Sequence, residues 1–393
     1  MRLEPTTVKK DFRQSVQQFV ARTLPADIRE KIRQGRRLGR DELTAWYRML
    51  DTRGWATPRW PQQAGGAGWT EAQHAIFDEE LQLNDAPRMV FPGIMMLGPT
   101  LIESGTDEQK ARYLPHIRSS ATWWAQGFSE SEAGSDLAAV GTMAEFINDA
   151  SGPHYVIPGR KLWTSCAHFC DMMFCLARTN SVADRPQRGL SLLLLDMNAP
   201  GVSLRWLRTI DGGDDLNEVT LDRVRVPVAD RLGAEGEGWT YAKYLLGFER
   251  GGITGVGSAK KLLLRLQTLH AIHTKRGPTS RLLGDQISKL YIEVLALEAT
   301  ANRLLAQASS DLAAPSILKI GGTELRQKLT RILLQYAKPS DVYPAPDETL
   351  PHSDCIGATA NPALTFLEMR KLSIYGGTNE IQRNIIAKQI FGD

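Results

Sequence analysis

The sequence predicts an α+β protein of several domains, in which a helical region, a β-rich region and a second helical region follow one another. Apolar residues recur at helical spacing up to about residue 122 and again after about residue 230. Between them lie short runs of β-branched and apolar residues, separated by Gly, Pro, Asn and Asp. The 393 residues are also too many for one hydrophobic core. We therefore expect domains over residues 1–122, 123–229 and 230–393.

The first region should begin with a long helix. Apolar residues recur at helical spacing from Val8 to Val20, and Pro25 follows the run. Residues 61–68 are rich in glycine and form a predicted loop. Three further helices are expected, each opened by a side-chain cap: Asp41 to about Gly54, Thr70 to about Leu83, and Thr106 to Ile117.

The middle region has the sequence pattern of an antiparallel β-sandwich or barrel. Its short apolar runs are separated by turn residues at the spacing that such folds show. Strands are expected at residues 142–146, 155–157, 171–177, 191–196, 202–207 and 218–228.

The last region predicts a C-terminal four-helix bundle. Helical periodicity covers residues 262–269, 283–306, 316–336 and 363–374, whereas residues 338–361 are rich in Pro and Asp and predict a long loop. The glycines of residues 251–257 do not follow a strand and lack the Gly-x-Gly-x-x-Gly spacing. We interpret them as sites of close helix packing and not as a dinucleotide-binding loop.

Composition excludes several classes of function. The formal net charge of +3 is spread without long basic runs, which argues against a nucleic-acid partner. No apolar run reaches the roughly 18–20 residues of a membrane span. The N-terminus lacks the apolar core of a signal peptide, and four cysteines are too few for a disulfide scaffold. We expect a cytoplasmic protein with reduced thiols.

Cys166, Cys170 and Cys175 cluster around His168 and could in principle bind a metal ion. Their spacing is not Cys-x-x-Cys, and no second group of ligands follows. We expect inert thiols in a β-rich segment, and no metal.

Three segments carry the functional signal. The first is Gln126-Gly-Phe-Ser-Glu-Ser-Glu-Ala-Gly-Ser-Asp136, whose hydroxyls and backbone N–H groups suit a polar planar ligand or a phosphate. The second, Gly159-Arg-Lys-Leu-Trp-Thr-Ser165, adds a large aromatic ring and two hydroxyls. The third is Tyr375-Gly-Gly-Thr-Asn-Glu-Ile-Gln-Arg383. In this order and at these distances they resemble the flavin-contacting motifs of the acyl-CoA dehydrogenase family, along nearly the whole chain.

The resemblance implies FAD as cofactor and particular residues for it. Phe128 would offer backbone groups, Ser129 would bond the flavin pyrimidine edge, and Ser135 would reach the pyrophosphate. Trp163 would pack on the ring system, and Ser165 would hydrogen-bond near N5. The remaining implied FAD contacts are Gln126 at the rim, and Thr378 and Glu380 at the adenosine half. Ser135, Arg250 and Gly376 are the implied substrate contacts.

The resemblance also implies the reaction, which is α,β-dehydrogenation of an acyl-CoA thioester. Many family members carry the catalytic glutamate as the second residue of Tyr-Glu-Gly-Thr, but this chain has Gly376 there. A second family solution places the glutamate before an arginine on an earlier helix. Here that pair is Glu249 and Arg250, so Glu249 is the expected base and Gly376 would keep a backbone N–H for the thioester carbonyl.

Assembly is expected to depart from the common homotetramer. The arginine that relatives send to a neighbour's FAD is one place out of register here, at Arg281, and no Gln-x-x-Gly-Gly stretch occurs between Pro339 and Asn361. The chain resembles the large subunit of heteromeric enzymes such as pimeloyl-CoA dehydrogenase and the steroid side-chain acyl-CoA dehydrogenases. We expect an α2β2 tetramer with a second dehydrogenase-like subunit, or else a homo-oligomer, in lipid catabolism.

Three functions remain open from sequence. The first is an acyl-CoA dehydrogenase that passes electrons to an electron-transfer flavoprotein. The second is a flavin-dependent monooxygenase or oxidase of the same fold, which would not need a base at Glu249. The third is a non-catalytic partner subunit. The glutamate and the complete first flavin motif favour the first.

Overall fold

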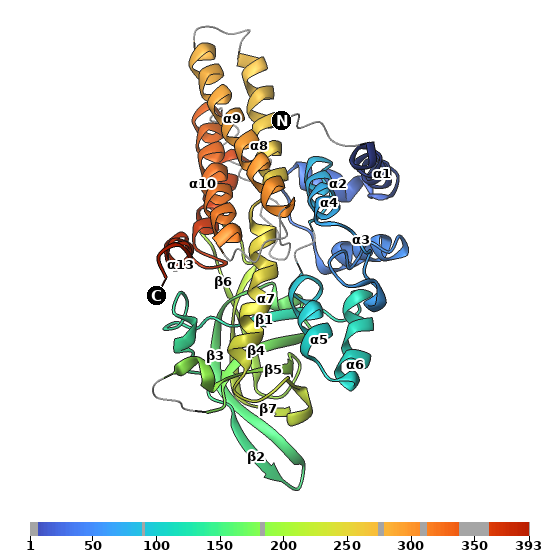
Figure 1. Ribbon diagram of the computed structural model, residues 1–393, viewed down its shortest axis with the longest axis vertical. Helices are drawn as coiled ribbons and strands as arrows, with labels where there is room; N and C mark the ends of the chain where they lie inside the picture. Colours follow the sequence, from blue (N-terminus) through green and yellow to red (C-terminus); the bar gives the residue numbers. More distant parts are fainter. Residues whose placement is uncertain are drawn as a thin grey trace. The chain divides into compact units, whose positions relative to one another are not determined.

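The computed structural model describes residues 7–88, 91–180, 185–273, 279–306, 313–337 and 361–392, and it confirms the order of helices, β-strands and helices (Figure 1). The chain folds into two compact units that interleave along the sequence. The first unit comprises Met1–Leu38, Trp69–Met89 and Arg250–Asp393, and the second comprises Gly39–Gly68 and Val90–Glu249.

The second unit contains two four-stranded sheets, with strand orders β1-β4-β5-β8 and β2-β3-β7-β6. The predicted sandwich is confirmed, but neither sheet closes into a barrel. Sequence analysis also missed β1, which pairs in parallel with β4, so the sheets are not wholly antiparallel. The strands are β1 (Trp124–Gly127), β2 (Glu145–Asp149), β3 (Gly152–Ser165), β4 (Met172–Arg178), β5 (Leu190–Asp196), β6 (Val202–Leu207), β7 (Leu216–Pro227) and β8 (Arg231–Leu232).

The inner faces of the two sheets form one core. Alternate residues of β4 and β5, such as Met173, Cys175 and Leu193, are fully buried in the same cluster as Tyr155 of β3 and Val219 of β7. The period of two follows from the pleat of a strand, which turns every second side chain to the same face. Burial of these side chains removes apolar surface from water and holds the sheets together.

The helices of the second unit are α3 (Arg40–Thr52), the π-helical η2 (Gly93–Leu97), α5 (Gly98–Ser104), α6 (Asp107–Arg118) and most of α7 (Gly238–Ile253). Thr106 caps α6 as predicted, because its Oγ1 accepts a hydrogen bond from the Gln109 N–H at 3.2 Å. The predicted cap at Asp41 is wrong. Gly39 occupies the cap position of α3, and its N–H donates to Glu42 at 3.0 Å.

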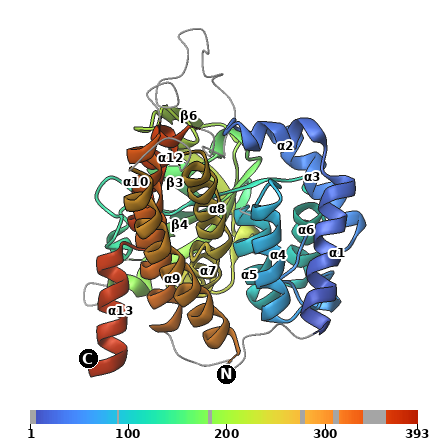
Figure 2. The same ribbon diagram turned by 90° about the horizontal axis from the view of Figure 1, so that it is seen from above.

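The first unit is helical. Its helices are α1 (Thr7–Thr23), α2 (Ala26–Arg33), α4 (Glu71–Leu83), α8 (Val256–His273), α9 (Thr279–Ala306), α10 (Ala313–Tyr336), α12 (Pro362–Glu368), the 3₁₀ helix η7 (Met369–Ser373) and α13 (Asn379–Phe391). Figures 1 and 2 show α8, α9 and α10 side by side, with α13 against α10. Their core contains Leu266, Leu283 and Leu329, which are fully buried.

Partly buried ion pairs join four helices of the first unit. Arg13 of α1 donates to both Glu79 and Glu80 of α4. Lys260 of α8 donates to Glu79 at 3.0 Å and to Glu298 of α9 at 2.5 Å. The two glutamates of α4 are almost fully buried. Each therefore depends on these partners, because a buried unpaired charge is strongly destabilising.

Two expectations for the C-terminal region are refined. The helix expected over 363–374 is α-helical only to Glu368, and the 3₁₀ helix η7 continues it to Ser373. Of the loop expected over 338–361, residues 338–360 lie outside the described residues. Asn361 ends it by capping α12, since its Oδ1 accepts from the N–H of Ala363 at 2.9 Å.

Candidate active site

Trp163 lies at an irregularity in β3. The register of β3 against β7 shifts between Lys161 and Thr164, and Trp163 has a φ of 61° within this bulge. Its side chain is 56% exposed. A left-handed backbone is strained for a bulky residue, and such strain is concentrated at functional sites. The bulge thus holds a large aromatic ring on the surface of the sheet, where a planar ligand can pack against it.

Lys161, two residues before that tryptophan, is completely buried and organises the neighbouring segment. Its Nζ donates to the carbonyl oxygen of Leu176 at 2.6 Å, to Glu130 Oε1 at 2.7 Å and to the carbonyl oxygen of Phe128 at 3.2 Å. Three acceptors satisfy all three donors of the ammonium group. Lys161 therefore ties β3 and β4 to the segment that begins at Phe128.

Glu130 extends this connection to the other end of the hydroxyl-rich turn. It accepts hydrogen bonds from the N–H of Gly141 at 2.8 Å and from that of Thr142 at 3.1 Å. Burial acts to raise the pKa of Glu130, but the charge and hydrogen bond of Lys161 outweigh it, and the pKa lies below its ordinary value. The carboxylate therefore stays ionised and closes residues 130–142 into one loop.

The first two predicted flavin motifs meet directly. The N–H of Leu162 donates to the carbonyl oxygen of Ser129 at 2.8 Å, which joins the segment after β1 to the strand that carries Trp163. The Phe128 ring is buried edge-to-face against Phe174 at a centroid distance of 5.8 Å, so only its backbone is available to a ligand. The backbone role expected of Phe128 stays a prediction.

The remaining residues of these motifs differ in exposure. Gln126 lies in β1 and is half-buried, Ser135 is exposed on the turn, and Ser165 is exposed at the end of β3. Beside Ser165, the Thr164 hydroxyl is buried and has no hydrogen-bond partner among the described residues. An exposed ring, several hydroxyls and an unpaired buried oxygen fit a planar cofactor with a hydrogen-bonding edge, as the isoalloxazine of FAD has.

The third motif forms a glycine turn at the start of α13. Gly376 and Gly377 have φ of 65° and 79°. Gln382 Nε2 donates to their carbonyl oxygens at 3.0 and 3.2 Å, and Ser316 of α10 donates to Gln382 Oε1 at 2.7 Å. Sequence reasoning missed both Gln382 and Ser316, although Gln382 stands within the motif. These bonds hold the turn in a left-handed conformation that suits glycine.

Thr378 and Glu380 lie at the N-terminus of α13. Thr378 caps the helix, since its Oγ1 accepts from the N–H of Ile381 at 3.2 Å. Glu380 is exposed in the first turn, and hydrogen bonds from its own backbone N–H and from Thr378 lower its pKa. Both side chains thus have local roles in the helix start, beside the cofactor role that the resemblance implies.

Glu249 and Arg250 lie in α7, near its C-terminal end. Their side chains lie outside the described residues, so their directions are not described. The site residues predicted from sequence also divide between the two units. Gln126, Phe128, Ser129, Ser135, Trp163, Ser165 and Glu249 belong to the second, whereas Arg250, Gly376, Thr378 and Glu380 belong to the first.

The cysteine segment has an ordinary structural environment. Cys175 is buried in the sandwich core, and His168 Nδ1 lies 2.9 Å from Asn217 Oδ1. Within the described ranges, no group of three or more His, Cys, Asp or Glu side chains could hold a metal ion. No helix in the described part of the chain is long and apolar enough to cross a membrane.

A β-sandwich that carries an exposed tryptophan beside hydroxyl-rich segments fits the class of flavin-binding proteins. Family models match the chain in order: acyl-CoA dehydrogenase N-terminal domain over residues 6–121, middle domain over 125–224 and C-terminal domain over 236–391. The chain therefore belongs to the acyl-CoA dehydrogenase family. It is an oxidoreductase, and its cofactor is FAD.

Relatives and solved structures agree with this family. Acyl-CoA dehydrogenase IpdE1 of Mycobacterium tuberculosis (strain ATCC 25618 / H37Rv) is 35% identical over 90% of this chain and 88% of its own length. Acyl-CoA dehydrogenase IpdE1 of Mycolicibacterium smegmatis is 33% identical over 98% of this chain and 97% of its own. In the ChsE4-ChsE5 complex from Mycobacterium tuberculosis, one chain is 26% identical with a TM-score of 0.82, covering 100% of this chain and 99% of that one.

Proposed function

We propose that this acyl-CoA dehydrogenase uses the carboxylate of Glu249 as its base and works as the flavin-binding subunit of a heteromeric complex. The observation that carries the proposal for the base is the glycine turn at Gly376. Its φ of 65° and the bond from Gln382 to its carbonyl suit glycine, and a side chain there would add backbone strain of about 1–2 kcal/mol. The base must then come from another element, and Glu249 on α7 is the glutamate that the family resemblance supplies.

The proton transfer sets a requirement on Glu249. The α-hydrogen of a thioester is a weak acid, so its removal needs a carboxylate whose pKa is raised toward the working pH. Burial beside the acyl chain would raise it, because a low dielectric disfavours the charged form. The N–H of Gly376 would donate to the thioester carbonyl and stabilise the negative charge that develops there. Arg250 would act next to Glu249 in substrate binding.

FAD, when bound, supplies the hydride acceptor at N5 for the β-hydrogen. The residues of the second unit would position it. Trp163 would pack against the ring, the Ser129 hydroxyl would bond the pyrimidine edge, and Ser165 would bond near N5. Ser135 would reach the pyrophosphate and the substrate, while Thr378 and Glu380 would lie by the adenosine half. We propose an electron-transfer flavoprotein as the electron acceptor.

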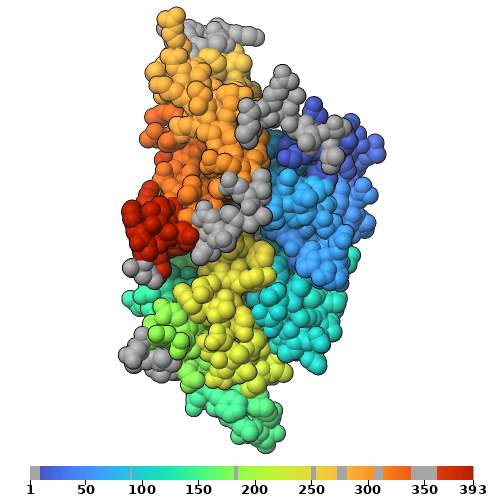
Figure 3. All heavy atoms as spheres, in the orientation of Figure 1, coloured from blue at the N-terminus to red at the C-terminus, as the bar shows by residue number. Residues whose placement is uncertain are grey.

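Exposed apolar side chains on α9 support a partner subunit. Leu282, Tyr291, Ile292 and Leu295 are 59%, 47%, 66% and 44% exposed, and α9 is coloured orange in Figure 3. Apolar side chains gathered on one helix are typical of a protein interface. Arg281, near the start of the same helix, is out of register with the arginine that homotetrameric relatives share. The similar ChsE4-ChsE5 structure is described as a complex of two proteins. We propose an α2β2 assembly that acts in lipid catabolism in the cytoplasm.

The base is tested by Glu249→Gln. This variant should bind FAD and acyl-CoA but reduce its flavin about 10²- to 10⁴-fold more slowly, because the amide cannot accept the α-proton. Stopped-flow absorbance of the flavin with a saturating acyl-CoA measures the reductive step alone. Glu145→Gln, an exposed glutamate on β2, makes the same change in charge and should react as the wild type. Flavin reduction at the wild-type rate in Glu249→Gln would show that another group is the base.

A further inference from the structure

The glycine turn at the start of α13 leaves backbone donors free. Gly376 and Gly377 have φ of 65° and 79°. Within the described ranges, neither residue donates its N–H to a backbone or side-chain acceptor. These N–H groups can serve a ligand only if the turn keeps one conformation, because glycine has more conformational freedom than any other residue. The conformation of the turn must therefore be fixed by its neighbours.

Gln382 holds the turn from inside the first unit. Its side chain is fully buried, and its Nε2 donates to the carbonyl oxygens of Gly376 at 3.0 Å and of Gly377 at 3.2 Å. An amide group has two N–H donors, so both bonds can form at once. The fit is close, since a Cβ on Gly377 would lie 2.5 Å from Nε2. Gln382 therefore fixes the two peptide planes on which these carbonyl groups lie.

The peptide plane that carries the N–H of Gly376 lies between two anchored planes. On one side, Gln382 binds the carbonyl oxygen of Gly376. On the other side, the N–H of Tyr375 donates to the carbonyl oxygen of Lys371 in η7 at 3.1 Å. A trans peptide is planar, so its orientation follows from the dihedral angles at its two ends. Anchors on both sides thus set the direction of the Gly376 N–H.

Ser316 of α10 supports the far end of the Gln382 side chain. Its hydroxyl donates to Gln382 Oε1 at 2.7 Å, and neither residue has exposed surface. Water does not compete for this bond, and its loss would leave a buried acceptor unpaired. A chain of hydrogen bonds therefore runs from α10 through Gln382 to the turn.

The same face of α10 holds the first residue of α13. Lys319 Nζ donates to Asn379 Oδ1 at 2.9 Å, and the hydroxyl of Thr323 lies 3.3 Å from the same atom. Ser316, Lys319 and Thr323 are separated by three and four residues, which places them on one face of the helix, and all three are fully buried. This polar face of α10 therefore fixes both Asn379 and Gln382.

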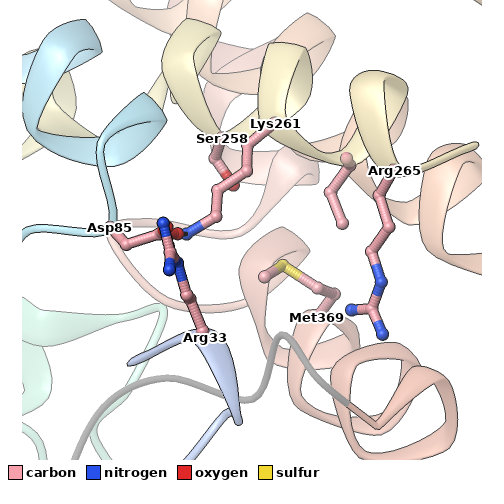
Figure 4. A pocket seen from close by; sticks show the side chains of 7 residues that line it. Arg33, Asp85, Ser258, Lys261, Arg265 and Met369 are labelled. Atoms are coloured by element: carbon pink, nitrogen blue, oxygen red, sulfur yellow. Dashed lines mark hydrogen bonds and ion pairs between the residues drawn. The ribbon is translucent and has the colours of Figure 1, made fainter. Parts of the chain in front are cut away.

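The 3₁₀ helix η7, which leads into the turn from the other side, is anchored as well. Gln327 of α10 donates from Nε2 to the carbonyl oxygen of Met369 at 3.1 Å and to Ser373 Oγ at 3.1 Å. Figure 4 shows the Met369 side chain facing α8, in the pocket that Lys261 and Arg265 also line. The turn therefore lies between two segments that α10 holds.

We propose that Gln382, supported by Ser316, is a positioning residue that aims the N–H of Gly376 at the thioester carbonyl of the substrate. Gln382 acts through the turn and does not itself touch the substrate. A donor that is held in place beforehand needs no reorganisation when negative charge develops on that carbonyl. The inference rests on the proposed contact between Gly376 and the thioester carbonyl, and it does not depend on Glu249.

Gln382→Met tests this role, because methionine has nearly the same length but cannot donate to the turn. In stopped-flow absorbance with octanoyl-CoA, we expect flavin reduction at saturation to be about 10- to 100-fold slower, since a misplacement of about 1 Å can cost up to that much. The Kd for octanoyl-CoA should change little, because the lost contact strengthens only as charge develops. Gln34→Met makes the same substitution at an exposed residue that bonds Glu30 at 2.9 Å, and it should react as the wild type.

Infrared difference spectra report the hydrogen bond to the carbonyl directly. The probe is oct-2-enoyl-CoA labelled with ¹³C at its carbonyl carbon. A bond from the preorganised Gly376 N–H polarises this carbonyl, so its stretching frequency should fall when the probe binds to the wild type. Gln382→Met should show a smaller fall. Binding of the probe involves no proton transfer, so the result does not depend on Glu249.

Ser316→Ala tests whether the support from α10 passes through Gln382. Alone, it should slow flavin reduction, but less than Gln382→Met does. Added to Gln382→Met, it should cause no further loss, because residues that act in one chain of bonds are not additive. Ser288→Ala, which removes an exposed hydroxyl from α9, is the matched control and should react as the wild type.

Amide hydrogen exchange separates failure of this inference from failure of the proposed function. Over residues 371–382, exchange should be faster in Gln382→Met than in the wild type. Unchanged exchange, or an unchanged carbonyl frequency, in folded Gln382→Met would overturn the positioning role and leave the Gly376 contact standing. No fall of the carbonyl frequency in the wild type would instead remove that contact, and this inference with it. FAD content and melting temperature show whether each variant has folded, and Ser316→Ala carries the same measurements if Gln382→Met has not.

Discussion

Single residues hold the hydroxyl-rich segment over residues 128–142 in place. Lys161 has no exposed surface, and its three acceptors connect two strands with Phe128 and Glu130. Other protein groups also satisfy the carboxylate of this ion pair, since Glu130 accepts hydrogen bonds from two backbone N–H groups. A buried pair of this kind contributes little net stability against an apolar pair of the same shape. Loss of one partner is nevertheless costly. We interpret Lys161 as a positioning residue for the loop that carries Ser129 and Ser135.

Lys161→Met should release that loop. We expect a loss of about 3–5 kcal/mol in the free energy of unfolding, because Glu130 is left as an uncompensated charge. We also expect the Kd for FAD to rise at least tenfold. Denaturant unfolding measures the first effect, and quenching of FAD fluorescence during titration of the apoprotein measures the second.

The double variant Lys161→Met/Glu130→Gln separates stability from positioning. It removes both charges, so much of the stability should return, while FAD binding should stay weak because Phe128 has lost its donor. Arg225→Gln provides the control, since it breaks the exposed pair of Arg225 with Asp149 in the same unit and should cost at most about 1 kcal/mol. Wild-type FAD affinity in folded Lys161→Met would refute a positioning role.

Among the elements, the break between α7 and α8 is closely packed. The chain leaves the helix at Thr254 and Gly255, and Gly255 has a φ of 64°. A Cβ on Gly255 would lie 2.6 Å from the guanidinium carbon of Arg326, and one on Gly322 of α10 would lie 2.0 Å from the carbonyl oxygen of Thr254. Arg326 is buried there, and burial lowers its pKa to about 10. The prediction of close helix packing at these glycines is confirmed at Gly255.

Two adjacent glycines of α10 offer a matched test of this contact. Gly322→Ala must push the Thr254 backbone away, and we expect a loss of about 1–3 kcal/mol in the free energy of unfolding. Gly321→Ala meets only the Leu297 side chain, at 3.6 Å, and should gain up to about 1 kcal/mol because alanine favours the helix. Chemical denaturation of the two variants and the wild type compares them. Equal stability of the two variants would mean that the α7–α8 break yields easily.

At the scale of the whole molecule, one function is distributed over a chain that folds as two interleaved units. The residues that we propose for FAD in the second unit come from β1, β3 and the segment between them, while Thr378 and Glu380, proposed for the adenosine half, belong to the first unit. The exposed apolar residues of α9 also belong to the first unit. We retain the three domains over 1–122, 123–229 and 230–393 as a proposal. In the proposed heteromer, a second subunit completes the FAD site to which this chain contributes.

The content of FAD tests this proposal. The chain should be purified alone and together with the product of any adjacent acyl-CoA dehydrogenase-like gene. We expect the lone chain to retain little flavin and the mixed complex to retain about one FAD per pair of subunits. Absorbance of the released flavin, with the mass of each species by light scattering, gives both numbers. One FAD for each chain in a homotetramer of the lone protein would disprove the heteromer.

Much of the fold follows from local signals. The caps Thr70 and Thr106 and the periodic runs after them predict α4 and α6 well, because a capping bond and a helical face involve residues only a few positions apart. The flavin motifs with Ser129, Trp163 and Ser165 were likewise proposed from sequence, through their resemblance to the motifs of the family, and these residue roles stay predictions. The family, its cofactor and its reaction type were therefore within reach of the sequence alone.

Tertiary structure decided what depends on distant partners. The four-residue β1 was missed because it is a strand only by pairing with β4, some fifty residues on. A lysine is expected on the surface, but Lys161 is buried because β3, β4 and Glu130 enclose it. Trp163 has a left-handed backbone because the register of β3 shifts against β7 at this point. Burial, register and charge balance are properties of contacts between segments, so they arise only when the chain has folded.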